Sequence, residues 1–144
     1  MNVLAHFLAD SLNPLFGLLV LSAPFVGPRP RPTRVLPFYL ASGLGLAVAV
    51  MLAEIGKERV VWPGHPGFPS GHETFALACA TSLVCWRREW LWVAVPLSVV
   101  MGWALVVAGY HQPVEVFGAL LTGPTPTLLC HGWRLRQQPD GAGL

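Results

Sequence analysis

Charged side chains are scarce in this sequence, and their scarcity excludes an ordinary soluble domain. Only 11% of the 144 residues are Asp, Glu, Lys or Arg, against about 25% in a typical soluble protein. Hydrophobic residues make up 53%, and the mean hydropathy is +0.55. The net charge of +2 gives no sign of a nucleic-acid partner. The sequence therefore predicts an integral membrane protein, and its length allows one domain.

Cysteine and basic N-terminal residues are also few. The three cysteines lie in apolar runs and form neither a CxxC pair nor a Cys/His zinc spacing, so we expect neither a metal ion nor a cofactor. No Lys or Arg precedes Arg29, although a cleavable secretory signal needs a basic start. The first apolar run is therefore predicted to be a retained membrane helix.

Five apolar stretches are predicted to cross a membrane as helices, since one crossing needs roughly 20 apolar residues. They are Asn13–Val26 with the preceding His6–Leu12, Val35–Ile55, Ser70–Trp86, Leu91–Ala108 and Val114–Cys130. The fold class is thus all-α, an integral-membrane bundle of about five transmembrane helices formed by residues 1–133. Residues 134–144 are expected to form a short cytoplasmic tail.

Lys and Arg are distributed unequally between the two ends of such a bundle. Five crossings place two of the nine, Lys57 and Arg59, at one end. The other seven are Arg29, Arg31, Arg34, Arg87, Arg88, Arg134 and Arg136. Because cytoplasmic loops are enriched in positive charge, the seven are expected in the cytoplasm, and the end with Lys57 outside. We expect a multi-pass protein of a cell membrane, and the preference for arginine over lysine is associated with bacteria and hence with an inner membrane.

Histidine and glutamate gather at the outward end. The group consists of His6, His65, His72, His111, Glu54, Glu58, Glu73 and Glu115. Ionisable groups at membrane depth are costly and usually mark function. Two separate turns contribute these residues, which simple solvation of a loop does not explain. His6 is expected to have no function, and His131 is expected at the opposite membrane interface.

The polar stretch 64–73 reads Gly-His-Pro-Gly-Phe-Pro-Ser-Gly-His-Glu and connects the second and third predicted helices. Ser70 followed by Glu73 has the spacing of a capping box, so a helix is predicted to begin here. The first backbone N–H groups of a helix can bind an anion, and His72 falls in that first turn. The local pattern alone indicates only the start of a helix.

Two motifs together resemble the type 2 phosphatidic acid phosphatase family, which is related to bacterial acid phosphatases and vanadium haloperoxidases. They are Pro-Ser-Gly-His at 69–72 and Gly-Tyr-His-Gln-Pro-Val-Glu-Val-Phe-Gly at 109–118. The resemblance covers roughly Glu54–Gly118. It implies a hydrolase of lipid phosphomonoesters or pyrophosphates at the outer membrane surface, without a metal. The candidate substrates are isoprenyl (pyro)phosphates, phosphatidic acid and phosphatidylglycerophosphate; the oligomeric state is left open.

The resemblance also implies a role for each residue of the site. His111 would be the nucleophile that forms a phosphohistidine, His72 the acid that protonates the leaving oxygen, and Glu115 the group that orients His111. Ser70 and the Gly71 N–H would hold phosphate oxygens. We therefore expect the two imidazoles to face each other across about one phosphate, with Glu115 within hydrogen-bond reach of His111.

The first family motif is out of register in this sequence. It has a lysine, six residues and then Arg-Pro, but Glu58 and His65 occupy the lysine and arginine positions here. Lys57 and Arg59 flank the lysine position, and a shift of one residue in the loop would bring either to the phosphate. Lys57, Arg59 and His65 are therefore all candidates to bind phosphate.

The third family motif lacks its arginine. Ala104 and Leu105 stand where the family has Ser-Arg, and Glu115 replaces an aspartate. Two alternatives to the phosphatase consequently stay open. One is a degenerate family member that binds lipid phosphate or a partner protein without turnover. The other is a small transporter or assembly subunit, for which Ser98 and Thr122 are thin support.

Overall fold

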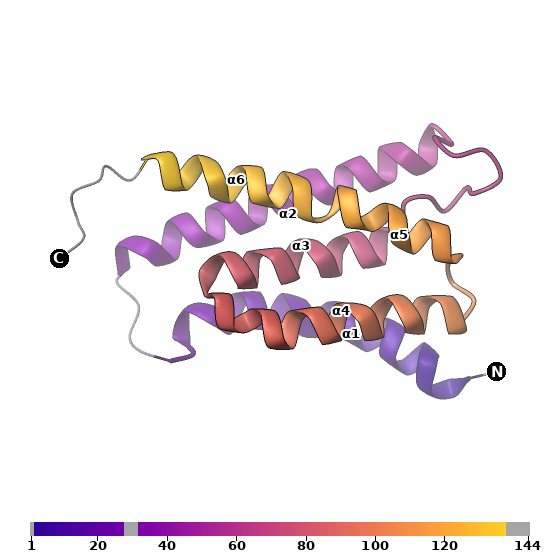
Figure 1. Ribbon diagram of the computed structural model, residues 1–144, viewed down its shortest axis with the longest axis horizontal. Coiled ribbons are helices and arrows are strands. Elements are labelled where there is room, and N and C mark those ends of the chain that lie inside the picture. Colours follow the sequence, from indigo (N-terminus) through magenta and orange to yellow (C-terminus); the bar gives the residue numbers. More distant parts are fainter. Residues whose placement is uncertain (1, 28–31, 138–144) are drawn as a thin grey trace.

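The computed structural model describes residues 2–27 and 32–137, and this part of the chain is helical apart from its connections (Figure 1). Its α-helices are α1 Val3–Ser22, α2 Pro32–Glu58, α3 Gly71–Trp86, α4 Leu91–Val107, α5 Pro113–Thr122 and α6 Pro124–Gln137. Two short 3₁₀ turns follow α1 and precede α4, at Ala23–Phe25 and Arg88–Trp90. The predicted all-α fold class is confirmed, since these residues contain no strand.

The helix α3 lies at the centre of the bundle and contacts each of the other five. The remaining helices pair beside it, α2 along α6 and α1 along α4 (Figure 1). Small side chains on α3, among them Ala76, Ala78 and Ala80, are buried. Small residues let neighbouring helices approach closely in a membrane. The first turn of α3 is thereby placed in the middle of one end of the molecule.

Successive connections between helices lie alternately at the two ends of the bundle. The N-terminus, the α2–α3 loop and the α4–α5 turn lie at one end, whereas the start of α2, the α3–α4 turn and the end of α6 lie at the other (Figure 1). The five predicted stretches require this alternation. The two polar turns that carry His72 and His111 therefore meet at the same end.

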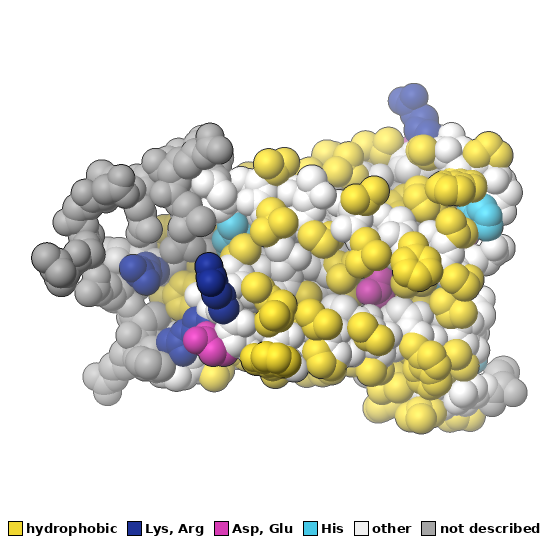
Figure 2. Space-filling model, viewed as in Figure 1, with side chains coloured by type: hydrophobic (Ala, Val, Ile, Leu, Met, Phe, Trp, Pro, Cys, Tyr) yellow, Lys and Arg dark blue, Asp and Glu magenta, His cyan; other side chains and the backbone are white. Residues whose placement is uncertain are grey.

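Three helical segments are long and apolar enough to cross a membrane: Val3–Phe25, Thr33–Glu58 and Arg88–Val107. They correspond to the first, second and fourth predicted crossings. α3 has 16 residues and rises about 24 Å, which is shorter than a usual crossing. Hydrophobic side chains cover most of the visible face, and Lys and Arg side chains lie toward the two ends (Figure 2). Such a surface suits a membrane protein.

The fifth predicted stretch is two helices and not one. α5 ends at Thr122, and α6 begins at Pro124, which has no N–H to continue the hydrogen-bond ladder. Gly123 between them lies so close to α3 that a Cβ would be 2.8 Å from the Thr74 carbonyl oxygen. α6 then continues to Gln137, so the helix extends past the boundary expected at residue 133. Residues 138–144 of the expected tail lie outside the described part, as do Arg29 and Arg31 of the basic loop.

Candidate active site

The loop before α3 is fastened to α5 by backbone hydrogen bonding. Ser70 is fully buried, its Oγ accepts the Glu73 N–H at 3.3 Å, and its own N–H donates to the Glu115 carbonyl oxygen at 2.8 Å. The Ser70 hydroxyl thus caps α3, as the sequence predicts. The reciprocal half of the capping box does not form, because the Ser70 N–H that Glu73 would accept is already bonded to α5. The Glu73 side chain turns to a different face of α3.

The turn between α4 and α5 is shaped by a single carbonyl group. The Leu105 carbonyl oxygen accepts the N–H groups of Tyr110 and His111, at 3.0 and 3.3 Å. Gly109 has φ +78°, a left-handed conformation that costs glycine little. The Leu105 side chain itself is fully buried in the apolar core. The position that carries an arginine in the resembling family therefore faces the core here.

Glu115 is the point at which the two turns meet. Its Oε2 lies 2.8 Å from His111 Nδ1 and accepts the Gln112 N–H at 3.1 Å, while Oε1 accepts the Gly67 N–H at 3.1 Å. The Glu115 side chain is only 6% exposed. The expected hydrogen-bond reach between Glu115 and His111 is confirmed. With Nδ1 held by the carboxylate, Nε2 is the ring nitrogen left to react.

Gly67 is a residue of this site that sequence reasoning missed. A Cβ on Gly67 would lie 2.7 Å from Glu115 Oε2 and 2.9 Å from Oε1. Only glycine lets the loop backbone approach the carboxylate closely enough to donate its N–H. The glycine content of stretch 64–73 was visible in the sequence, but its contact partner lies 48 residues away.

His72 and His111 face each other, as expected. Their ring centroids are 6.1 Å apart and the ring planes are inclined by 59°. His72 is exposed in the first turn of α3, whereas the His111 side chain is 12% exposed. One phosphate group can contact both rings from this side. The exposed ring can exchange protons with water, and the held ring keeps its orientation.

Of the three candidate phosphate ligands from the first motif, the structure brings Lys57 to His72. Lys57 Nζ lies 2.7 Å from Glu54 Oε1, and a Cβ on Gly71 would be 2.9 Å from Nζ. The ammonium group therefore sits beside the first residue of α3. Arg59 lies beyond the end of α2 and is exposed. The His65 ring packs edge-on against Trp62 in the loop, at 6.2 Å between centroids.

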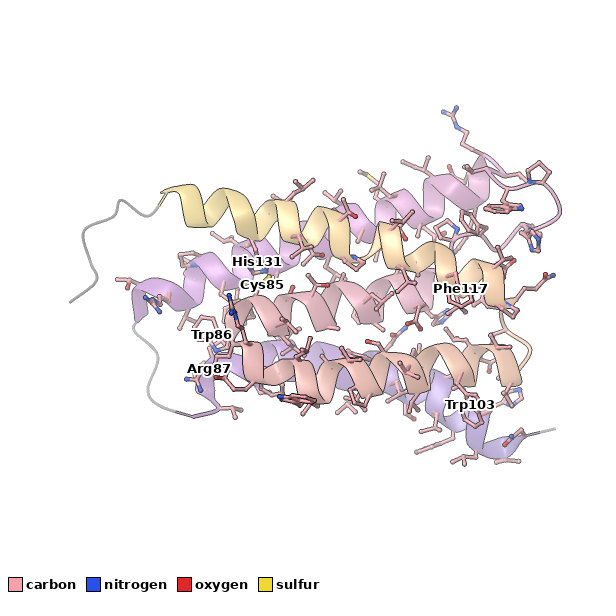
Figure 3. All side chains as sticks on the ribbon, in the orientation of Figure 1. Cys85, Trp86, Arg87, Trp103, Phe117 and His131 are labelled. Atoms are coloured by element: carbon pink, nitrogen blue, oxygen red, sulfur yellow. The ribbon has the colours of Figure 1, made fainter. Side chains whose placement is uncertain are left out.

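Two hollows adjoin this region. The first has a volume of about 460 Å³ and lies between α1, α2 and α3, with His72 in its wall. Its other lining residues are Asn13, Pro14, Gly17, Val50, Glu54, Lys57, Gly71 and Phe75. The second is an apolar groove of about 710 Å³ along α3, α4 and α5, which Trp103 and Phe117 line (Figure 3). Within residues 2–27 and 32–137 no cluster of three His, Cys, Asp or Glu side chains could hold a metal.

Comparison with known proteins identifies the class to which this fold and site belong. Residues 13–139 match the profile of the PAP2 superfamily, and the chain belongs to that family. The resemblance inferred from the two motifs is thereby confirmed.

Two relatives are similar to part of the chain. The "Putative undecaprenyl-diphosphatase YbjG" of Escherichia coli (strain K12) is 39% identical over 57 residues, which are 39% of this chain and 29% of the relative. The "Undecaprenyl-diphosphatase BcrC" of Bacillus subtilis (strain 168) is 35% identical over 54 residues, 38% of this chain and 28% of the relative. Each match spans less than a third of the relative's length. No solved structure matches the chain.

Proposed function

We propose that the protein is a membrane lipid phosphatase that acts through a phosphohistidine on His111, with an isoprenyl diphosphate as its substrate. The observation that carries the proposal is the arrangement of His111 between Glu115 and His72, 2.8 Å from the carboxylate and 6.1 Å between ring centroids. Membership of the PAP2 superfamily supports the reaction class. The names of both relatives support a lipid diphosphate over phosphatidic acid or phosphatidylglycerophosphate.

The first half of the reaction transfers a phosphoryl group to the enzyme. His111 Nε2 attacks phosphorus and forms an N–P bond, while the bond from phosphorus to the leaving oxygen breaks. Protonated His72 gives its proton to that oxygen, so the lipid product departs without an added charge. Glu115 offsets the positive charge that the His111 ring gains.

The second half releases inorganic phosphate. A water molecule attacks phosphorus from the side that the lipid product has left, and neutral His72 takes a proton from it. The N–P bond breaks, and its electron pair returns to His111 Nε2. Phosphate leaves with His72 protonated again, so both histidines regain their starting states.

Phosphate oxygens are stabilised by groups at the start of α3. The first N–H groups of this helix have no partner within it, and the helix dipole favours an anion there. The Lys57 ammonium beside Gly71 adds a full positive charge. Preorganised donors of this kind typically contribute about 10²–10³ in rate each. Ser70 acts indirectly in this scheme, because its buried hydroxyl caps the helix.

The site is proposed to face outward from the cytoplasm. Arg34, Arg87 and Arg88 lie at the opposite end of the bundle from His72, and cytoplasmic ends are enriched in such residues. An outward site on a multi-pass protein would act on lipid phosphates of the outer leaflet. The five crossings needed for this topology include α3 and the α5–α6 pair.

A member of the family that binds lipid phosphate without turnover is the second candidate function. The buried Leu105 side chain favours it, since this position supplies no cation to the phosphate. One experiment separates the two candidates. Purified protein in detergent is given an isoprenyl diphosphate, and inorganic phosphate release is measured for wild type, His111→Ala and His6→Ala.

We expect release by wild type and His6→Ala, and none by His111→Ala. His6 is the control because it lies at the same end, where its ring contacts Tyr110 at 5.3 Å between centroids. A radiolabelled substrate with the label on the terminal phosphate should mark wild type after an alkaline quench. Unchanged release by His111→Ala would refute the nucleophile, and a folded wild type without release would favour the binding protein.

A further inference from the structure

His72 borders both the His111 ring and a cavity. The two ring centroids are 6.1 Å apart. The cavity of about 460 Å³ lies between α1, α2 and α3, and His72 forms part of its wall while His111 does not line it. The residue proposed to deliver the proton is thus in contact with this cavity.

In-line phosphoryl transfer decides what the cavity receives. The attacking and leaving atoms lie on opposite sides of phosphorus, so the leaving group departs away from His111. The residue that protonates the leaving oxygen must lie next to it. Because His72 lines the cavity, a leaving group that points into the cavity lies next to this acid. The part of the substrate beyond the scissile bond is therefore expected among α1, α2 and α3.

Asn13 is the polar residue that α1 contributes to the lining of this cavity. Its Oδ1 is buried without a hydrogen-bond partner among the described residues, so this oxygen cannot itself meet a ligand in the cavity. The NH₂ group of the same side chain carries two N–H donors that can bind an anion.

The cavity offers more hydrogen-bond donors than an alcohol leaving group requires. Lys57 has three donors, of which Glu54 takes one at 2.7 Å. The Glu54 carboxylate also lines the cavity and repels an anion, while it holds the ammonium group beside Gly71. Asn13 adds two neutral donors from the opposite wall. A leaving phosphate needs such donors on several oxygens, whereas a leaving hydroxyl group needs only the proton from His72.

The remaining lining suits the start of a hydrocarbon chain. Pro14, Val50 and Phe75 are apolar, and Gly17 has no side chain to fill the space beside them. A Cβ on Gly17 would only reach ordinary contact with Phe75 Cζ, at 3.9 Å. α1 and α2 both pack on α3, which leaves the cavity between them.

We propose that Asn13 binds the lipid-side phosphate of a diphosphate substrate and so makes the enzyme prefer lipid diphosphates to lipid monophosphates. This assignment rests on the proposed phosphatase function. Asn13 contributes when the leaving group is a phosphate and is idle when the leaving group is an alcohol. The preference then originates on the first helix, outside both motifs that carry the catalytic histidines.

The test compares two substrates with the same isoprenyl chain, one a diphosphate and one a monophosphate. Phosphate release is measured with full-length protein in detergent for wild type, Asn13→Leu and Asn2→Leu. Asn13→Leu should lower kcat/KM for the diphosphate by roughly 10- to 100-fold, as loss of a hydrogen bond to a charged group predicts, and change the monophosphate value by less than about threefold. Asn2→Leu removes the other asparagine, which caps α1 through the Ala5 N–H, and should leave the substrate ratio unchanged.

Each other outcome contradicts the assignment in a distinguishable way. Equal loss of kcat/KM on both substrates would make Asn13 a structural residue, and unchanged kcat/KM on both would remove it from the site. If Asn13→Leu does not fold, Asn13→Asp serves instead. A carboxylate facing a leaving phosphate must lower the ratio of kcat/KM for the diphosphate to kcat/KM for the monophosphate below the wild-type ratio. Wild-type protein that hydrolyses neither lipid would refute the proposed function, and the assignment with it.

Discussion

Two histidines toward opposite ends of the bundle, the proposed nucleophile His111 and the buried His131, have different surroundings. His111 Nδ1 lies 2.8 Å from the Glu115 carboxylate, and the ring faces a second histidine. His131 Nε2 lies 3.3 Å from the Ser42 hydroxyl, and its ring packs near Phe38 with centroids 5.9 Å apart. A carboxylate stabilises a cationic ring, whereas a hydroxyl group does so only weakly. We infer that the hydrogen-bond partner of a histidine ring and the access of substrate to it decide whether the ring can take part in the proposed reaction.

The two environments also differ in which elements they connect. The Glu115 side chain joins loop 59–70 to the α4–α5 turn, and both segments are exposed to solvent at their edges. His131 is 4% exposed and joins α6 to α2 inside the bundle, near the end where Cys85, Trp86 and Arg87 lie (Figure 3). His131 thus lies toward the end at which it was expected, with its side chain buried between helices (Figure 3). Its position follows from the close packing of α6 on α2, where a Cβ on Gly45 would be 2.7 Å from Thr127 Cα.

The largest effect is expected when His111 loses its charged partner and so becomes more like His131. Glu115→Gln keeps the size of the side chain but removes its charge, and an amide cannot accept all three hydrogen bonds in the same way. We expect kcat for phosphate release to fall by roughly 10²–10³-fold. Glu115→Asp restores the residue of the resembling family and should retain most activity. A Glu115→Gln enzyme within threefold of wild type would show that the carboxylate does not support His111.

An intermediate effect is expected when the carboxylate is displaced but kept. In Gly67→Ala the new methyl group would lie 2.7 Å from Glu115 Oε2, so the carboxylate must shift and loosen its hold on His111. We expect kcat to fall by roughly tenfold, as a misplaced catalytic group predicts. Gly43→Ala on α2 is the matched control, because a Cβ there meets nothing within 4 Å. Equal activity of the two variants would contradict the view that the hydrogen bond from the Gly67 N–H holds Glu115 in position for His111.

The smallest effect on activity is expected at the other histidine. Ser42→Ala removes the hydroxyl group that His131 contacts, far from the proposed phosphate site. Activity should stay within about twofold of wild type, while the free energy of unfolding should fall by about 1 kcal/mol. Thermal unfolding in detergent and phosphate release on the same sample measure both quantities. A loss of activity without a loss of stability would contradict the proposed site, because it would give the end with His131 a role in phosphate release.

The parts of the site that lie within a few residues of each other could be predicted from the sequence. Glu115 follows His111 by four residues, one turn of helix, so their contact needs no knowledge of the tertiary fold. The placement of His72 and His111 at the same end followed from the number of crossings between them, whereas the facing of their rings was expected from the family resemblance. Local spacing and the alternation of helix directions are features that a sequence displays directly.

The remaining features depend on where helices end and what they pack against. The Lys57 side chain lies beside the first residue of α3, whereas Arg59 lies past the last residue of α2, Glu58, and is exposed. Asn13 is an isolated polar residue at the start of the apolar stretch Asn13–Val26. One residue gives no spacing from which a role could be predicted. The break at Gly123 and Pro124 divides the stretch Val114–Cys130, which was predicted as one helix. Each of these outcomes is set by contacts between segments far apart in the chain.

The short central helix has a consequence for the surrounding lipid. A bilayer has a hydrocarbon core of roughly 30 Å, so a helix of 16 residues that rises about 24 Å falls short by about 6 Å. The helical segments Val3–Phe25, Thr33–Glu58 and Arg88–Val107 around it have 23, 26 and 20 residues, so each rises about 30 Å or more. Hydrophobic mismatch of this kind is relieved when the bilayer thins locally or when water enters from one side. In the proposed topology the start of α3 becomes the floor of a recess, where a lipid can present its phosphate without rising out of its leaflet.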